Sequence, residues 1–307
     1  MKTAYKIRYF YIIAVISILI FATITIDSYE FHGEFHYHYL WFAVLAQVLE
    51  WILLSIAWQQ TILRLSNKSQ NLADCFTQLT MVMVGKYIPG KVWGMLARGM
   101  HLKTTGLDYA ESLVATYVEQ ILFVHTGITL GSLAWYLVTG SGLWALLGIV
   151  SMLGILLVPA LNTWLFSTGN RIIRRWLADK VRLPDTPTTL NMADYVRLYL
   201  LYTLHWLADL AIPSAVFLVV SPQWPTTDLL LLLAGANAFG IIVGFFAFFA
   251  PGGIGVREGV IVGLMLAYMP LQDAMLFVLA YRLWLVIADL FSLGVVFVIR
   301  RLGSATQ

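Results

Sequence analysis

The sequence predicts an all-α integral membrane protein, and its composition, its hydropathy and the length of its apolar runs support this prediction. The chain has 307 residues, of which 60% are hydrophobic and 11% are charged, whereas soluble domains carry about 25% charged residues. Its mean hydropathy is +0.80. Apolar runs approach the length of about 20 residues that a helix needs to cross a bilayer. We interpret residues 1–307 as a single polytopic membrane domain.

Seven apolar runs are long enough to span the membrane. The first follows three basic residues, as in a signal peptide, but it is too long for a signal h-region and no small-residue cleavage site follows it. We therefore expect an uncleaved first span. The seven runs are Tyr9–Ile26, Tyr39–Trp58, Ser112–Val138, Leu143–Phe166, Tyr195–Val220, Leu229–Ala250 and Ala274–Ile299.

Two shorter apolar pieces each adjoin a Pro-Gly pair. Proline cannot donate to the hydrogen-bond ladder of a helix, and glycine adopts backbone angles that other residues avoid, so a helix breaks at such a pair. The pieces are Leu72–Ile88, before Pro89 and Gly90, and Gly259–Met269, after Pro251 and Gly252. Each is too short to span comfortably. We predict two re-entrant hairpins, each broken at Pro-Gly.

The second break is the most informative stretch of the chain. It reads FFAPGGIGVREG, with two further glycines at Gly253 and Gly255 before the charged pair Arg257 and Glu258. Broken backbone in lipid is tolerated only where protein buries it or water reaches it. Charges at such a break are expensive and are usually retained for function. A surface turn between two ordinary spans is the alternative interpretation.

The basic residues predict the orientation. They gather before the first span, after the second, before the third (Arg98 and Lys103), between the fourth and fifth, and after the last. Residues 168–193 form the largest such segment, which we interpret as a cytoplasmic basic loop with an interfacial helix. The loops Asp27–His38, Gly140–Gly142, Ser221–Asp228 and Pro270–Asp273 contain no Lys or Arg. The positive-inside rule then places both termini in the cytoplasm.

This topology makes the two hairpins enter the bilayer from opposite faces, which suggests inverted repeats. Transporters place substrate sites where such broken helices meet, with the N-termini of half-helices facing anionic groups. Two unrelated re-entrant loops are the alternative.

Four basic residues remain that lie in or beside apolar sequence, and we predict that they bind an anion. They are Lys86, Lys91, Arg257 and Arg282. The planar fork of arginine suits phosphate because it donates two parallel hydrogen bonds, while lysine acts as a point charge. The carboxylates that would balance this charge without a ligand are Glu258, Glu119 and Asp289, with Asp209 as a further candidate.

Structural ion pairs that hold helices together are the alternative for these residues. The alternative is strongest for Arg282 and Asp289, which are seven residues apart and share one face of a helix. His205 and Asp209 also share a face, where they could relay protons or, as we favour, make an interhelical hydrogen bond. Glu50 and His125 are similar cases.

No cofactor and no metal site are expected. The histidines of the first external loop have no Cys or carboxylate cluster beside them to define a metal geometry, and the chain contains no P-loop, HExxH motif or nucleophile elbow. A net charge of +3 without a basic and aromatic groove gives no indication of nucleic-acid binding.

The motifs resemble a known family. GKYIPGKVWGMLAR at Gly85–Arg98, Glu119, APGGIGVREG at Ala250–Gly259 and YRL at Tyr281–Leu283 are similar to the lysylphosphatidylglycerol synthase transmembrane region. This is the flippase-like domain of the multiple peptide resistance factor and of stand-alone proteins in bacterial and archaeal cytoplasmic membranes. Members often carry Glu-Arg in the third span, where this chain has Gln120 after the glutamate.

The resemblance implies movement of a lipid head group across the bilayer. Because the aminoacyl-transfer domain is absent, it does not imply lysine transfer, and we do not expect an enzyme. We expect a flippase for a lipid with an anionic, phosphate-bearing head group, whose partners are the lipid itself and a glycosyltransferase or lipid-synthesis enzyme. The alternatives are a membrane-embedded transferase acting on a polyprenyl phosphate or phospholipid, and a non-transporting scaffold for a glycosyltransferase.

Overall fold

The computed structural model describes residues 35–88, 92–107, 109–160, 190–221 and 225–304, together with residues 164 and 168. All regular secondary structure within these residues is helical, without a strand, which confirms the all-α prediction. The predicted first span, Tyr9–Ile26, and most of the predicted basic loop 168–193 lie outside the described residues.

Six helices in the described part of the chain are long and apolar enough to cross a membrane, and they coincide with the remaining six predicted spans. A short 3-10 helix, η1 (Tyr37–Tyr39), precedes the first of them. The six are α2 (Leu40–Ser66), α5 (Tyr109–Thr139), α6 (Gly142–Gly154, continued by η2, Ile155–Leu157), α8 (Met192–Val220), α9 (Thr227–Phe246) and α11 (Leu271–Ser304).

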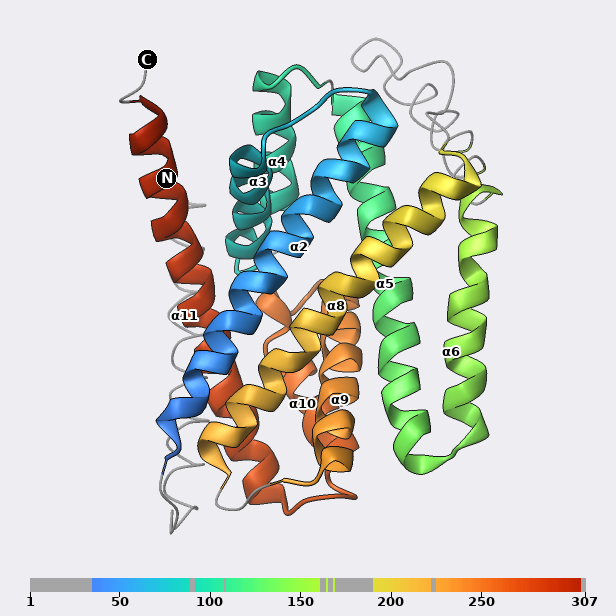
Figure 1. The fold of residues 1–307 in the computed structure, drawn as a ribbon, viewed down its shortest axis with the longest axis vertical. Coiled ribbons are helices and arrows are strands. Elements are labelled where there is room, and N and C mark those ends of the chain that lie inside the picture. Colours follow the sequence, from blue (N-terminus) through green and yellow to red (C-terminus); the bar gives the residue numbers. More distant parts are fainter. Residues whose placement is uncertain are drawn as a thin grey trace.

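Each predicted break joins two helices that pack side by side. α3 (Leu72–Gly85) and α4 (Trp93–Thr104) form the first pair, and α9 and α10 (Val256–Met265) form the second, with the 3-10 turn η3 (Pro251–Gly253) between them. Figure 1 shows α3 and α4 in the upper half of the molecule and α9 and α10 in the lower half. The two pairs therefore approach the middle from opposite ends.

Polar side chains cap the N-termini of α3, α8 and α9. The side chain of Asn71 accepts a hydrogen bond from the backbone N–H of Asp74 at 2.7 Å at the start of α3. Asn191 does the same at the start of α8, and Thr226 at the start of α9. Such caps satisfy backbone N–H groups that the first turn of a helix leaves unpaired.

The helix contacts repeat in the same order in two halves of the chain. In the first half α2 packs on α3, α3 on α4 and α4 on α5; in the second half α8 packs on α9, α9 on α10 and α10 on α11. The contacts between halves are also reciprocal, because α5 packs against α9 as α11 packs against α3, while α2 and α8 pack together at the centre. This is the arrangement expected of an inverted repeat with its axis between α2 and α8.

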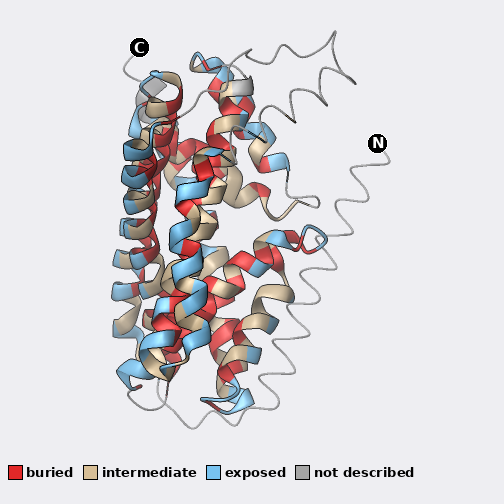
Figure 2. Cartoon of the chain, turned by 90° about the vertical axis from the view of Figure 1, so that its right-hand side faces the viewer, coloured by how far each residue is buried: buried red, intermediate tan, exposed pale blue. Residues whose placement is uncertain are grey.

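The interior consists of two apolar clusters with a polar seam between them. On α2 the first cluster begins at Leu54 and the second contains Ala43. On α8 the first cluster ends at Tyr202 and the second begins at Ile212. Figure 2 shows the buried residues on the inward faces of the helices. On α2 and α8 the polar residues that lie between the two apolar clusters are Glu50, His205 and Asp209.

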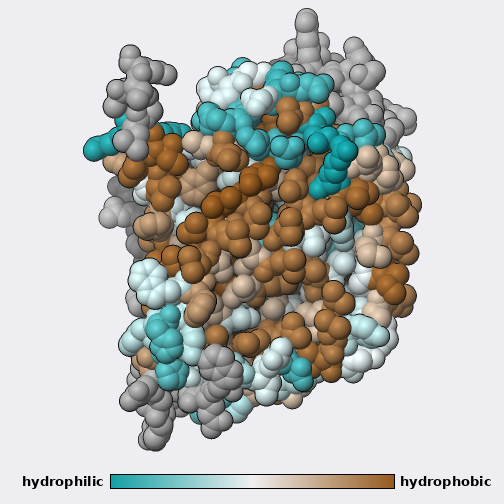
Figure 3. Space-filling view, in the orientation of Figure 1, coloured by the Kyte–Doolittle hydropathy of each residue, from teal (hydrophilic) through white to brown (hydrophobic). Residues whose placement is uncertain are grey.

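The surface agrees with a molecule that spans a bilayer. Figure 3 shows a broad apolar band between hydrophilic ends. The end of α2, the α4–α5 connection, the start of α8 and the end of α11 share the upper end in Figure 1, and the described residues of the loops without Lys or Arg share the lower end. The loops thus group as predicted. The assignment of the basic end to the cytoplasm rests on the positive-inside rule and stays a prediction.

Candidate functional site

The two helix breaks touch in the middle of the molecule. The backbone N–H of Gly252 in η3 donates to the backbone carbonyl of Lys86, just after α3, at 2.7 Å. Asp289, near the middle of α11, pairs with the Lys86 Nζ at 2.8 Å and accepts from the Tyr87 hydroxyl at 2.6 Å. Irregular backbone from both hairpins is thus held against charged side chains halfway along the longest helix.

Arg282 connects α11 to the second break. Its Nη1 donates to the carbonyl oxygen of Gly252 at 3.1 Å and lies 3.3 Å from Glu258 Oε1. Glu258 also accepts from the backbone N–H of Gly255 at 2.7 Å, so its carboxylate sits at the start of α10. A helix N-terminus favours an anion through its free N–H groups and its dipole. Here a carboxylate of the protein itself occupies that position.

Arg257 points to α9 and α11. Its Nη2 donates to Asn237 Oδ1 at 2.8 Å and to the Tyr281 hydroxyl at 3.0 Å. Asn237 is fully buried and its amide nitrogen lies 3.4 Å from Asp209 on α8. These contacts link four elements, α8, α9, α10 and α11, through one guanidinium group.

Several donors of the two arginines are buried without an acceptor. Among the described residues, the Nε of Arg257 and both Nε and Nη2 of Arg282 have no hydrogen-bond partner. Leaving a buried donor unpaired costs about 1–3 kcal/mol, and more for a charged group. Unpaired guanidinium donors at a helix break are therefore available to an anion.

The chain matches a family profile described as the lysylphosphatidylglycerol synthase TM region over residues 10–291. It belongs to this family. The match contains both breaks and the whole polar seam, which confirms the resemblance seen in the motifs. Membership places the chain among membrane proteins of lipid metabolism or transport. A search of curated proteins found no match.

Most predicted site residues of this family member come together at the seam. Within the described residues Lys86, Glu258, Arg282 and Asp289 are connected by ion pairs and by the hydrogen bonds of Gly252, and Arg257 lines the same narrow gap as Glu258 and Arg282. Gly252, Gly253 and Gly255 have positive φ angles of 58°, 72° and 82°, and Pro251 starts η3, so the predicted break motif is a true break. Pro89, Gly90 and Lys91 lie outside the described residues.

Glu119 lies elsewhere. It forms an ion pair with Arg98 of α4 and accepts from Gln120 at 3.2 Å, within the first half of the protein. The assignment of Arg98 to a cytoplasmic loop is wrong, because this residue is inside α4 and 1% exposed, with its guanidinium 3.4 Å from the centre of the Trp58 ring. A helix that turns back from the break carries Arg98 into the interior, where the sequence alone indicated a loop.

His205 and Asp209, the predicted polar pair on α8, contact different helices. His205 faces Glu50 of α2, with 3.4 Å between Nδ1 and Oε1, whereas Asp209 faces Asn237. His125 bonds to the backbone carbonyl of Ser151 at 2.9 Å, a contact that holds α5 to α6. The residues described include no group of three His, Cys, Asp or Glu that could hold a metal ion.

Sequence reasoning missed several polar partners at the seam. Asn237 is the single polar residue in the apolar run Leu229–Ala250, and this isolation is the signal that could have identified it. Tyr87 stands next to the first break, and Tyr281 next to Arg282. Gln47 accepts from the Trp284 indole at 3.1 Å and donates to Glu50 at 3.0 Å, which links α11 to α2.

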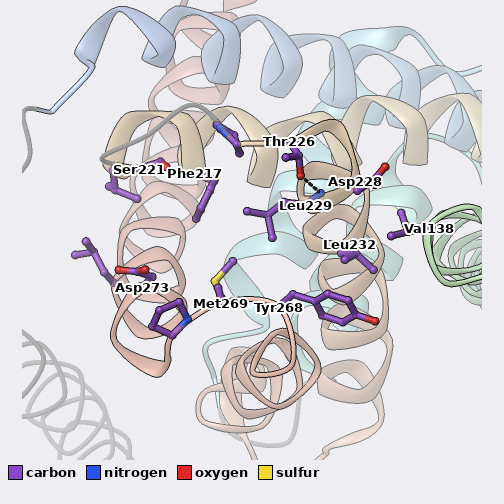
Figure 4. A pocket seen from close by; sticks show the side chains of 14 residues that line it. Val138, Phe217, Ser221, Thr226, Asp228, Leu229, Leu232, Tyr268, Met269 and Asp273 are labelled. Atoms are coloured by element: carbon purple, nitrogen blue, oxygen red, sulfur yellow. Dashed lines mark hydrogen bonds between the residues drawn. The ribbon is translucent and has the colours of Figure 1, made fainter.

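The charged residues enclose almost no free space, whereas a large cavity lies nearer one end of the molecule. The gap lined by Arg257, Glu258, Tyr281 and Arg282 is too narrow for a water molecule. A larger cavity of about 680 Å³ opens at the predicted external end, between α5, α8, α9 and α11, with Asp228 and Asp273 among its lining residues (Figure 4). This conformation therefore closes the charged seam while a wider cavity remains at one end.

Proposed function

We propose that this protein moves a membrane lipid with an anionic, phosphate-bearing head group across the bilayer. The observation that carries the proposal is the set of unpaired buried donors on Arg257 and Arg282, next to the contact between two broken hairpins. Guanidinium groups donate in parallel to phosphate oxygens. Family membership adds support, because the family belongs to lipid metabolism or transport.

The contacts of the seam suggest how a head group would bind. Glu258 and Asp289 now neutralise Arg282 and Lys86. A phosphate would compete with these carboxylates for the same cations, so binding would loosen the links between the hairpins and α11. Because the gap among these residues is closed, the hairpins have to separate before a head group can reach the arginines.

The cavity at the predicted external end fits the role of a vestibule. It is lined largely by apolar side chains such as Phe217, Leu232 and Met269, with carboxylates at Asp228 and Asp273. A surface of this kind accommodates a lipid whose tails remain in the bilayer while its head group moves along the seam. Opening of the hairpins from one side at a time would then give alternating access.

A reconstitution experiment tests the proposal. Proteoliposomes containing the protein would receive fluorescent derivatives of phosphatidylglycerol, phosphatidic acid and zwitterionic phosphatidylcholine, and an impermeant quencher would report the rate of exchange between leaflets. We expect faster exchange of the two anionic lipids than in protein-free vesicles. Equal rates with and without protein for every lipid would contradict the proposal.

Two lysines provide a matched pair of variants. Lys86 at the first break and Lys68 after α2 each form an ion pair with a carboxylate, at 2.8 and 2.7 Å. Lys86→Met should reduce anionic lipid exchange about tenfold or more, since a hydrogen bond to a charged group contributes about 1.5–3 kcal/mol. Lys68→Met removes the same chemistry away from the seam and should leave exchange unchanged.

A further inference from the structure

A carboxyl group in the middle of α2 lacks a permanent cationic partner. Glu50 is 5% exposed and accepts from the amide of Gln47, and its other neighbour is His205. A buried carboxylate without a cation is costly in a membrane protein and usually marks an ion or proton pathway. Neither the anion site nor the packing of α2 on α8 explains its presence.

His205 is also left unsatisfied. It is 2% exposed, neither ring nitrogen makes a hydrogen bond of good geometry within the described residues, and its polar neighbours are the backbone and the carboxyl group of Glu50, with Nδ1 3.4 Å from Oε1. One turn further along α8, Asp209 contacts Asn237, which in turn contacts Arg257. A row of titratable and polar groups thus leads from α2 to the arginine that faces the break.

The charges around this row do not balance. The charged groups that act on Glu50 are Asp209, Lys86 and Asp289, and those that act on Asp209 are Arg257 and Lys86. We call the following residues the seam cluster: Glu50, Asp209, Glu258, Asp289, Lys86, Arg257 and Arg282. Among the described residues it has four carboxyl groups and three cations. Within this described set one carboxyl therefore has no cation of its own.

We propose that Glu50 and His205 form a proton-binding site that couples proton uptake to binding of the anionic head group. The inference rests on the proposed function. A phosphate that pairs with Arg257, Arg282 and Lys86 adds negative charge to the seam and neutralises Lys86, the cation that acts on Glu50, so Glu50 then holds a proton more tightly. By thermodynamic reciprocity a proton must in turn strengthen lipid binding. Lipid and proton would then cross together.

The chemistry favours a proton over a metal ion. A buried metal site needs several ligands at fixed distances, and no cluster of three suitable side chains occurs in the described residues. A carboxyl beside an imidazole with free nitrogens can instead exchange a proton without any change in coordination. Asp209, whose charge acts on Glu50, is joined through Asn237 to Arg257, so the proton site and the arginine site influence each other electrostatically.

The first test measures protons directly and needs no turnover. Short-chain phosphatidylglycerol is added to the purified full chain in detergent with weak buffer and a pH indicator. We expect uptake of up to about one proton per lipid bound, and affinity that rises as pH falls. Glu50→Gln should abolish the uptake, while Glu111→Gln, at the surface pair with Lys68, should leave it unchanged. Binding without proton uptake in the unmodified protein would overturn the inference.

The second test separates this inference from the proposed function. In proteoliposomes, a difference of one pH unit should enrich the anionic lipid up to about tenfold in the leaflet on the higher-pH side, because one pH unit is a tenfold difference in proton activity. Glu50→Gln should lose this enrichment. His205→Gln provides a second variant if the first does not fold, with the same expected loss. No exchange at all in the unmodified protein contradicts the proposed function, whereas exchange that ignores the gradient contradicts only the coupling.

Discussion

The two hairpins each carry one ion pair, and the two ion pairs differ in their burial and in their neighbours. In each, the helix after the break forms an ion pair with the long helix that follows: Arg98 of α4 with Glu119 of α5, and Glu258 of α10 with Arg282 of α11. The side chains of the first pair are 1% and 5% exposed, and Arg98 is covered by Trp58. In the second pair Glu258 is 16% and Arg282 7% exposed, and both lie beside the η3 break.

The difference suggests that the first ion pair supports the fold and that the second belongs to the proposed anion site. Arg98 pairs with Glu119 beside the first apolar cluster, away from the point where the breaks meet, and only its Nε is left without an acceptor among the described residues. Arg282 instead shares its donors between a carboxylate and a backbone carbonyl, with two nitrogens left over. Under the proposed function, we expect the ion pair of the first half to stabilise the fold and that of the second half to take part in anion binding, because only the second contacts irregular backbone.

The largest effect on stability is expected when the buried ion pair between Arg98 and Glu119 is broken. Glu119→Ala leaves the Arg98 charge buried and uncompensated, so we expect the free energy of unfolding to fall by about 3–5 kcal/mol. The measurement is equilibrium unfolding in mixed micelles, together with the yield of folded protein.

A double variant checks whether this pair acts only on stability. Arg98→Met combined with Glu119→Leu replaces the ion pair by apolar side chains of similar volume, a change that is often neutral or stabilising. We expect it to recover most of the stability and most of the lipid exchange. A stable double variant without lipid exchange would place Glu119 in the transport site, as the sequence first suggested, and would end the distinction between the two pairs.

The second largest effect is expected at Arg257. Arg257→Ala removes the guanidinium that contacts Asn237 and Tyr281, and affinity for an anionic lipid should fall about tenfold to a hundredfold, since such a bond contributes about 1.5–3 kcal/mol. Arg257→Lys keeps the charge without the planar fork and should recover part of the affinity.

The melting temperature shows whether Arg257 binds the lipid or only stabilises the fold. Lipid binding and thermal unfolding would be measured on the same samples, with Arg301→Ala at the end of α11 as the surface control. A large drop in melting temperature for Arg257→Ala, with equal loss of binding for every lipid, would make Arg257 a structural residue like Arg98.

Much of the architecture could be predicted from the sequence because it depends on local properties. Run length and hydropathy predict the six described spans, and proline and glycine chemistry predicts the breaks. The partners of the charges depend instead on how far each helix is rotated about its axis. Arg98 therefore looked like a loop residue, and Glu119 looked like a partner of the second break. Asn237 was missed because its role depends on contacts with α8 and α10.

A smaller effect is expected at the contact between the breaks. Gly252 has a φ of 58°, and a Cβ added there would lie 3.0 Å from Arg282 Nη2 and 3.1 Å from the Tyr87 ring. Gly252→Ala should cost about 1–2 kcal/mol for the left-handed backbone, and it should slow lipid exchange because the closed contact between the hairpins re-forms less readily after each opening. Gly259→Ala, where a Cβ meets nothing within 4 Å, is the control and should not slow exchange. Equal exchange in both variants would show that the contact between the breaks has no part in transport.

The mildest test asks whether the two hairpins open to opposite faces of the membrane. Ser69 before α3 and Thr227 at the start of α9 are both exposed, and Cys75 is buried, so single cysteines at these two sites should leave stability nearly unchanged. Surface substitutions of this kind usually alter stability by less than about 0.5 kcal/mol.

In intact cells an impermeant thiol reagent should label Thr227→Cys and should label Ser69→Cys only after the membrane is permeabilised, because the basic loops are predicted to be cytoplasmic. Labelling of Ser69→Cys in intact cells would reverse the orientation and leave the inverted relation intact. Labelling of both cysteines from the same side would remove the inverted repeat, and with it the reason to compare the two ion pairs.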